Sequence, residues 1–131
     1  MSSQVRIKLA VCLLMILSSG GLFALKDNRG LLESLTNYPN PFDSRREGTW
    51  IAYQIPQDLP VRVGIYDLFG YKVREFRFMP GEEGARAGAN RIRWDGTDET
   101  GRKVSKGGYV CQVVVEGDLQ ARGVRKIGVI H

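Results

Sequence analysis

The sequence predicts an all-β domain, an antiparallel β-sandwich of six to seven strands preceded by an N-terminal signal segment. Three observations predict it. From residue 37 onward, short runs rich in Val, Ile, Tyr, Phe and Trp alternate with polar residues and stop at Gly, Pro or Asp. The same region contains no amphipathic helix of useful length. It comprises about 95 residues, the usual size of one two-sheet sandwich.

The start of the chain, MSSQVRIKLAVCLLMILSSGGLFA, has the parts of a secretory signal. Arg6 and Lys8 give it a positive start, an apolar run follows, and small residues at 18–21 form the exit. Cleavage near Gly21 divides the chain into a signal peptide (1–21), a short linker (22–36) and the sandwich (37–131). The alternative is an uncleaved anchor reaching about residue 25, but the apolar run is shorter than the ~20 residues that span a membrane. We therefore expect a bacterial protein of the periplasm, cell surface or medium, without a stable membrane span after cleavage.

The exported chain is mildly basic, and its charges are scattered. The formal net charge is +5, from 19 Lys and Arg against 14 Asp and Glu; loss of Arg6 and Lys8 leaves 17 against 14, or +3. The cations form separate pairs with acids between them, whereas polyanion binding needs clustered cations. We expect no nucleic-acid partner.

One cysteine remains after cleavage. Cys12 leaves with the signal, and Cys111 has the same strand parity as Tyr109, Val113 and Val115. Free cysteine is among the most buried residue types. We therefore expect Cys111 to be a buried apolar side chain, and the fold to hold together without a disulfide.

The first four expected strands follow from local patterns. WIAYQI (50–55) and VRVGIYD (61–67) alternate cleanly, and YKVREFRF (71–78) returns after a turn at Asp67 and Gly70. The step from Val73 to Phe76 breaks the period of two and predicts a bulge near Glu75. MPGEEGARAGA (79–89) predicts a long mobile loop, and NRIRWD (90–95) predicts the next strand.

Two further strands complete the prediction. GYVCQVVVE (108–116) is the clearest strand, and a turn leads to residues 119–130. A seventh strand is expected if residues 41–42 pair at an edge. The alternation predicts a core made of Ile51, Tyr53, Val63, Ile65, Val73, Phe76, Ile92, Trp94, Tyr109, Cys111, Val113, Val115, Ile127 and Val129.

The stretch WDGTDETG (94–101) holds three carboxylates, Asp95, Asp98 and Glu99. Asp accepts hydrogen bonds from nearby backbone N–H groups, and Gly adopts backbone angles that a Cβ forbids, so the stretch predicts a turn. A weak calcium site is the alternative, although the spacing misses the pattern of known calcium loops. The chain's single histidine is His131, and no catalytic triad or phosphate loop is present. We expect neither an enzyme nor a cofactor.

The stretch NYPNPF (37–42) predicts a rigid, extended segment, because both prolines fix φ and restrict the residue before them. Asn40 can bond across the turn, and Tyr38 and Phe42 are placed to cap one end of the sandwich. The segment is either a clamp where the chain joins the domain or a motif that a partner protein recognises.

These pieces together resemble the Ig-like domain named after the flagellar hook-capping protein FlgD, and equally its relative, the C-terminal sorting domain of type IX secretion cargo. The resemblance covers residues 37–131. It implies a fibronectin III-like antiparallel sandwich without catalytic residues, in which the WDG loop is structural. The residues that carry it are Tyr38, Pro39, Asn40, Pro41, Phe42, Asp67, Gly70, Trp94, Asp95, Gly96, Asp98, Gly101, Gly107 and Tyr109.

Two roles follow from the resemblance. The first is a sorting or attachment domain that an outer-membrane, type IX-like secretion machinery recognises through the last strand, at Arg125, Lys126, Ile127 and Val129. The second is an assembly or protein-interaction module of the periplasm or cell surface, including hook-capping-like assembly, that pairs through an exposed sheet edge. Both imply protein partners.

Overall fold

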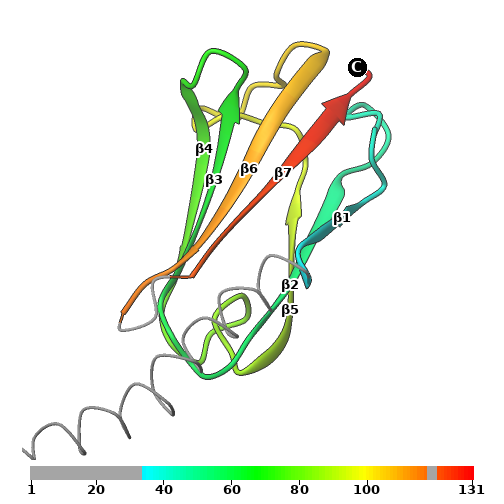
Figure 1. Ribbon diagram of the computed structural model, residues 1–131. Helices are drawn as coiled ribbons and strands as arrows, with labels where there is room; N and C mark the ends of the chain where they lie inside the picture. The colour runs from blue at the N-terminus through cyan, green and yellow to red at the C-terminus, as the bar shows by residue number, and fades with distance from the viewer. Residues whose placement is uncertain (1–33, 118–120) are drawn as a thin grey trace, which may run out of the picture.

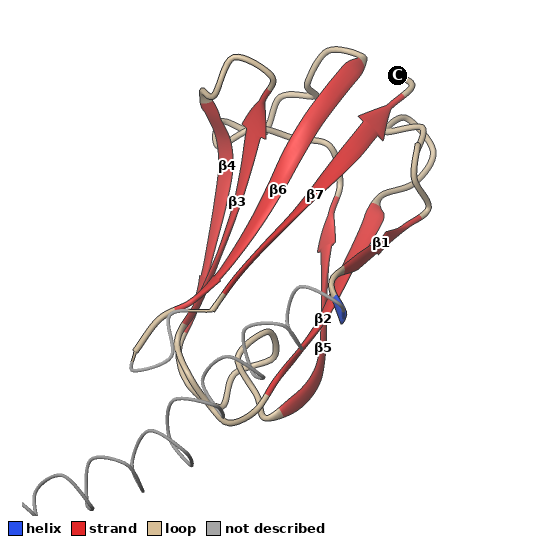
Figure 2. Ribbon diagram, viewed as in Figure 1, coloured by secondary structure: helices blue, strands red, loops and turns tan. Residues whose placement is uncertain are grey.

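The computed structural model describes residues 34–117 and 121–131, and this part of the chain is a two-layer β-sandwich (Figure 1; Figure 2). The predicted fold class is confirmed, with seven strands. The predicted signal peptide and most of the predicted linker lie outside the described residues. The strands are β1 (Thr36–Tyr38), β2 (Thr49–Ile55), β3 (Val61–Asp67), β4 (Lys72–Phe78), β5 (Gly88–Trp94), β6 (Gly107–Val115) and β7 (Arg122–Val129).

The strands form two antiparallel sheets that face each other. One sheet has the order β1-β2-β5, and the other has the order β4-β3-β6-β7. Pairing puts Ile51 opposite Ile92 in the first sheet and Val63 opposite Val113 in the second. Because side chains alternate along a strand, these pairs point to the same face of their sheet and fill the space between the layers. Among the described residues, no helix is long and apolar enough to cross a membrane.

The core matches the predicted set. Twelve of its fourteen residues are buried, and Val73 and Phe76 pack against them in half-buried positions. Cys111 is fully buried and free of a disulfide, as expected, and burial raises the pKa of its thiol to about 12. A thiol in this environment stays protonated and unreactive at neutral pH.

Three details correct the sequence prediction. The register of β3 and β4 shifts between Ile65 and Tyr66, so the bulge lies at Val73 rather than near Glu75. The seventh strand is β1, which pairs with β2, and Phe42 makes only a single parallel bridge to Val129. The sandwich also includes Leu35, which is 1% exposed and which the sequence assigned to the linker.

The segment between β4 and β5 is a compact hydrogen-bonded loop rather than an open one. The Asn90 side chain is buried; its Oδ1 accepts from the N–H groups of Gly84 and Arg86, and its Nδ2 donates to the Arg86 carbonyl. The Tyr53 hydroxyl donates to the Gly84 carbonyl at 2.5 Å, and Ala85 is fully buried. The glycine content of the segment predicted a mobile loop. In the structure, the buried side-chain amide of Asn90 in β5 holds the loop through hydrogen bonds.

Candidate functional site

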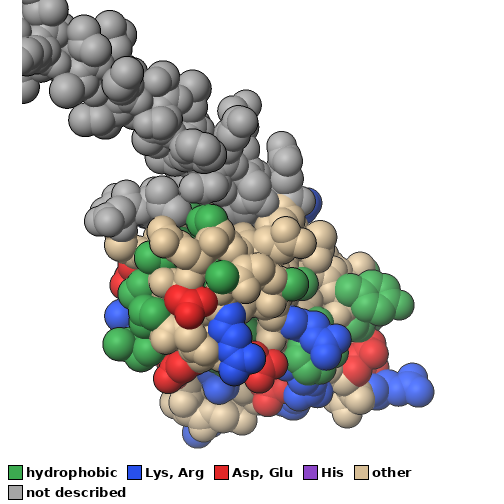
Figure 3. Space-filling view, turned by 90° about the horizontal axis from the view of Figure 1, so that it is seen from below, with side chains coloured by type: hydrophobic (Ala, Val, Ile, Leu, Met, Phe, Trp, Pro, Cys, Tyr) green, Lys and Arg blue, Asp and Glu red, His purple; other side chains and the backbone are tan. Residues whose placement is uncertain are grey.

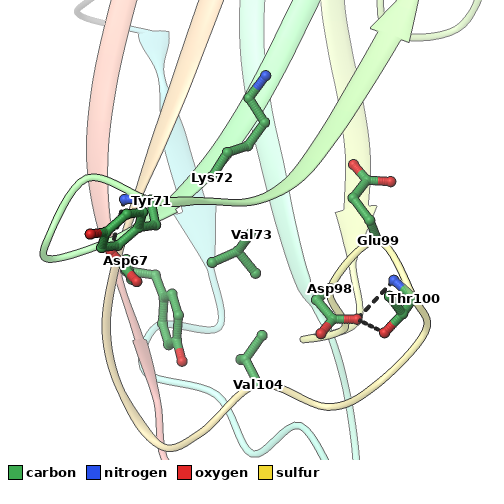
Figure 4. Close-up of a pocket in the computed structure, with 9 residues that line it drawn as sticks. Asp67, Tyr71, Lys72, Val73, Asp98, Glu99, Thr100 and Val104 are labelled. Atoms are coloured by element: carbon green, nitrogen blue, oxygen red, sulfur yellow. Dashed lines mark hydrogen bonds between the residues drawn. The ribbon is translucent and has the colours of Figure 1, made fainter.

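The WDGTDETG stretch is a pair of consecutive Asp-based turns. Asp95 Oδ1 accepts from the N–H and hydroxyl of Thr97, at 3.0 and 2.5 Å. Asp98 Oδ1 accepts from the N–H groups of Thr100 and Arg102 and from the Thr100 hydroxyl (Figure 4). Each carboxylate therefore holds the backbone that follows it, which is the role that the turn interpretation assigned to it.

Trp94 anchors this loop to the core. Its ring is fully buried and makes edge-to-face contacts with Phe42 and Tyr109, at centroid distances of 5.6 and 5.7 Å. Its Nε1–H donates to the Thr97 carbonyl at 2.9 Å. Gly96 has a φ of +83°, and a Cβ there would lie 2.7 Å from the Ser44 Cβ. The loop is thus fixed both by its own turns and by the core beneath it.

Glu99 covers the outer edge of β4. Its N–H donates to the Val73 carbonyl at 3.1 Å, and its carboxylate accepts from the Glu75 N–H at 2.6 Å. Arg74 reinforces the contact, because its guanidinium donates to the Thr97 hydroxyl and to the Asp98 carbonyl. The third acid of the loop therefore occupies the place that a neighbouring strand would take, which blocks this edge against pairing with another chain.

The NYPNPF segment covers the edge of β7 in the same way. Asn40 donates from Nδ2 to the Lys126 carbonyl at 3.0 Å and accepts at Oδ1 from the Gly128 N–H at 2.8 Å. Phe42 donates its N–H to the Gly128 carbonyl and accepts from the Ile130 N–H. These contacts identify the segment as a clamp. The peptide bonds before Pro39 and Pro41 are both cis.

The two aromatic residues of that segment differ in their environments. The Phe42 ring is fully buried against Trp94, as a cap of the sandwich should be. Tyr38 is 79% exposed and caps nothing. Strand parity could not separate them, because the chain between them contains two prolines and does not continue as a strand.

The turn between β3 and β4 holds an apolar surface that the sequence analysis missed. Asp67 Oδ1 accepts from the N–H groups of Phe69 and Tyr71, both at 2.9 Å, and Gly70 has a φ of +92°. Leu68, Phe69 and Tyr71 are 66%, 89% and 73% exposed, and together they form what we call the apolar turn. The sequence could have indicated this surface, because Leu68 and Phe69 stand between the turn-forming Asp67 and Gly70, where polar residues are usual.

A cavity of about 390 Å³ lies between the apolar turn and the WDG loop (Figure 4). Val73 and Val104 lie at its centre in Figure 4, with Tyr71 and Asp67 on one side and Asp98 on the other. Tyr109 also lines it and donates its hydroxyl to the Ser105 carbonyl at 2.7 Å. The remaining lining residues are Lys72, Glu99 and Thr100.

The geometry of the three acids bears on the calcium alternative. One oxygen of each carboxylate accepts backbone N–H groups, and Glu99 reaches the β4 edge rather than turning toward Asp95. No group of three or more His, Cys, Asp or Glu residues in the described ranges is arranged to hold a metal ion. Asp95 and Asp98 therefore hold the backbone of the loop, and Glu99 holds the edge of β4.

The expected recognition strand is only partly accessible. Arg125 and Lys126 are exposed, and Arg125 Nε donates to the Leu35 carbonyl at 2.6 Å. Ile127 and Val129 are 1% and 4% exposed and belong to the core. Gly107, another residue of the family motif, begins β6 with a φ of +145°. A partner that meets the folded domain at β7 therefore meets basic side chains and not the two apolar ones.

Comparison with known proteins tests the resemblance. No protein-family model matches the chain, and no characterised protein matches it in sequence. Several solved structures match its fold. PorZ, an essential surface component of the type IX secretion system of Porphyromonas gingivalis, matches with a TM-score of 0.56 and 19% identity over 78% of this chain and 12% of PorZ. Dimeric latent PorU from the same organism matches with a TM-score of 0.59 and 24% identity over 74% of this chain and 9% of PorU. FlgD from Xanthomonas campestris, described for hook capping essential to flagellar assembly, matches with a TM-score of 0.51 and 19% identity over 80% of this chain and 72% of FlgD.

The chain shares its fold with PorZ, PorU and FlgD. The fold that the sequence resemblance implied is therefore confirmed. The chain spans only a small part of PorZ and PorU, so the fold is one module within those large proteins.

The carboxylates of this sandwich make its stability depend on pH. The Thr100 hydroxyl lowers the pKa of Asp98, and Lys72 and Arg77 lower the pKa of Glu75 against the opposing effect of burial. Burial would raise the pKa of Asp95, but the hydrogen bonds from Thr97 and the nearby Lys103 and Arg74 outweigh it, so this pKa is also lowered.

We expect stability to be constant from neutral pH down to about pH 5 and to fall below about pH 4, by linkage. The ordinary pKa values are 3.8 for Asp and 4.5 for Glu, and groups with a lowered folded-state pKa stabilise the fold only while ionised. Denaturant midpoints measured from pH 7 to pH 3 check this. Asp98→Asn keeps an acceptor oxygen and should show a shallower fall. A midpoint that rises on acidification contradicts the prediction.

Proposed function

We propose that this protein is an exported, non-catalytic β-sandwich that docks to a protein of a bacterial secretion or surface-assembly apparatus. The observation that carries the proposal is the fold shared with PorZ, PorU and FlgD, which in PorZ and PorU is a small module of a large protein. The secretory signal predicted from the sequence supports an extracytoplasmic location.

The chemistry of the polar groups supports a non-catalytic role. A general acid needs a raised pKa and access to a substrate, whereas the pKa values of Asp95 and Asp98 are lowered and their carboxylates hold loop backbone. A nucleophilic cysteine needs an exposed thiolate, whereas Cys111 is fully buried and its pKa is raised. The hydrogen bonds from backbone N–H groups to Asp95 and Asp98 explain the acidic loop without a bound cation.

The specific role that we propose is a sorting or attachment domain recognised by a type IX-like machinery of the outer membrane. In this role the accessible part of β7, Arg125 and Lys126, contacts the machinery, while Ile127 and Val129 keep the strand in the sandwich. Recognition then requires the folded domain, because the sandwich positions the two cations beside the clamp formed by Asn40.

A reporter fusion in a type IX-competent bacterium tests this role. The reporter is inserted between the predicted signal and residue 22, and the rest of the chain is kept. We expect the reporter at the cell surface or in the medium. Arg125→Glu with Lys126→Glu should leave it in the periplasm, whereas Arg46→Glu with Arg93→Glu, the same charge change at other exposed sites, should not. A periplasmic reporter on the unaltered chain rejects the sorting role.

The second candidate role is an assembly module, including hook-capping-like assembly. The match to FlgD over most of that protein's length favours it, and the apolar turn supplies an exposed contact surface. Light scattering of the mature protein over a range of concentrations separates the two roles. A strict monomer at high concentration argues against self-assembly.

A further inference from the structure

The outer face of the four-stranded sheet carries an apolar patch that nothing in the described chain covers. Outer faces of a sandwich are usually polar. On the three-stranded sheet the outer ring of Trp50 lies under the guanidinium of Arg91, 4.2 Å from the ring centroid, and its pairing partner Tyr38 is 79% exposed. On the four-stranded sheet, Val124 is 51% exposed and Leu68 is 66% exposed. The outer face of the four-stranded sheet therefore presents exposed aliphatic side chains.

The strand register shows how this patch is built. Directly paired residues of antiparallel strands share a face, and the pairing gives three rows across β4, β3, β6 and β7. The first row is Lys72, Tyr66, Val110 and Lys126; the second is Glu75, Gly64, Gln112 and Val124; the third is Arg77, Arg62, Val114 and Arg122. The apolar centre is thus Tyr66, Val110 and Val124, with cations at the ends of the first and third rows.

Glycine shapes the centre of the face. A Cβ at Gly64 would lie 2.7 Å from the Tyr66 ring, so the ring lies flat across the sheet only because Gly64 has no side chain. Leu68 of the apolar turn lies over Gly108 in the same manner. The result is an open concavity of about 340 Å³ lined by Tyr66, Leu68, Val110 and Val124, with Asp67, Gly70 and Gln112 beside it.

The rim of this face is basic. Its cations are Lys72, Arg62, Arg77, Arg122 and Lys126, and its carboxylates are Glu75 and Glu116. Glu75 is within 4 Å of three of these cations, Arg62, Lys72 and Arg77, and Glu116 lies 3.6 Å from Arg62, so two carboxylates offset most of the positive charge on the β4 side. In the described part of the chain, Arg122 and Lys126 form no ion pair, so most of the uncompensated charge flanks Val124 on β7. At the lower end of the molecule, by contrast, acidic and basic side chains are interspersed (Figure 3).

We propose that this face, formed by β3, β6 and β7, binds a protein segment that has an apolar centre and acidic flanks. Aromatic and Arg side chains around an apolar centre are typical of protein interfaces. Arg122 and Lys126, which form no ion pair with a described residue, select a partner of opposite charge. The proposal builds on the docking role proposed above, but it specifies the surface and the partner's chemistry and does not depend on type IX recognition.

Two other occupants fit the face less well. A second copy docked face to face would bring Arg122 and Lys126 against cations of the same sign. A membrane surface would be entered by the most exposed apolar side chains, those of the apolar turn. Asp67, Asp98 and Glu99 line the cavity beside that turn, and carboxylates repel anionic headgroups.

A short peptide in which Glu alternates with Leu and Phe is the probe, and the control peptide has Lys in place of each Glu. Binding to the mature protein is followed by fluorescence anisotropy and by backbone amide shifts in NMR spectra. We expect shifts at Tyr66, Val110 and Val124, and an affinity about tenfold higher for the Glu peptide, an advantage that salt reduces.

Charge reversal supplies the matched comparison. Arg122→Glu with Lys126→Glu should weaken binding of the Glu peptide about tenfold, and Arg46→Glu with Arg93→Glu should leave it unchanged. The shift map on the unaltered protein needs no variant, so it decides the question even if a variant fails to fold. Equal binding of both peptides, or shifts confined to other faces, overturns the proposal.

Two further results overturn it in favour of another occupant. One is binding to vesicles of phosphatidylglycerol and phosphatidylcholine that charge reversal abolishes while the peptides do not bind. The other is a dimer in light scattering that the same reversal dissociates. Because the peptide experiment involves no secretion, periplasmic retention of the reporter rejects the sorting role and leaves this docking surface standing.

Discussion

Replacing Trp94 with Ala is expected to lower the free energy of unfolding by about 3–5 kcal/mol, the usual cost of removing a large buried aromatic side chain. Trp94 is fully buried between Phe42 and Tyr109, so the substitution leaves a cavity where both sheets and the NYPNPF clamp meet. It also removes the Nε1 hydrogen bond that holds the Thr97 carbonyl. Equilibrium denaturation by urea measures the loss.

Trp94→Phe separates the two contributions. It keeps most of the ring volume but removes the hydrogen bond to Thr97, so the destabilisation should be smaller than for Ala, on the order of 1–3 kcal/mol. The amide shifts of residues 95–101 should change in both variants, because the indole connects this loop to the core. A Trp94→Ala protein with unchanged stability contradicts the structure of the core.

Replacing Phe42 with Ala is expected to have an effect of similar size, about 3–5 kcal/mol. Its ring is fully buried against Trp94, and its backbone holds both Gly128 and Ile130 at the edge of β7. Loss of the ring loosens the clamp as well as the core. Hydrogen exchange of the Ile130 amide should therefore accelerate more than that of amides in the centre of β6.

Tyr38→Ala is the matched control, because it removes an aromatic ring from the same segment. Tyr38 is 79% exposed, and exposed substitutions usually change stability by less than about 0.5 kcal/mol. Since Phe42 and Trp94 touch, the Phe42→Ala and Trp94→Ala effects should not add in the double variant. Equal destabilisation by Phe42→Ala and Tyr38→Ala would contradict the placement of the clamp.

The two signature stretches share one structural task. Glu99 of the WDG loop covers the outer edge of β4, and Asn40 and Phe42 cover the outer edge of β7. Open edges pair readily with other chains. The four-stranded sheet is therefore protected at both of its edges near the end that carries the acidic loop.

Several features were predictable because they depend only on neighbouring residues. Period-two alternation placed twelve buried residues correctly, Cys111 among them. The Asp-based turns at Asp67, Asp95 and Asp98 were predictable from Asp and Gly, because an Asp side chain bonds the backbone two residues further on. The resemblance in the ordered motif also indicated the fold, although each piece is short.

Other features depend on residues far apart in the sequence. The bulge at Val73 arises from the pairing of β4 with β3, and the burial of Ala85 depends on the Asn90 amide in the next strand. The burial of Phe42 depends on Trp94 and on β7, which lies more than 80 residues after Asn40 and is joined to it by a hydrogen bond.

By itself, the sequence determined the all-β class, the inward faces of the strands and the chemistry of the turns, since each follows from backbone preferences over a few residues. Only the tertiary structure decided which edges are covered, which of two similar aromatic residues is buried, and how scattered cations come to surround one apolar patch. Those outcomes depend on strand pairing. Pairing places Arg62 in one row with Val114 and Arg122, although Arg62 is distant from both in the sequence.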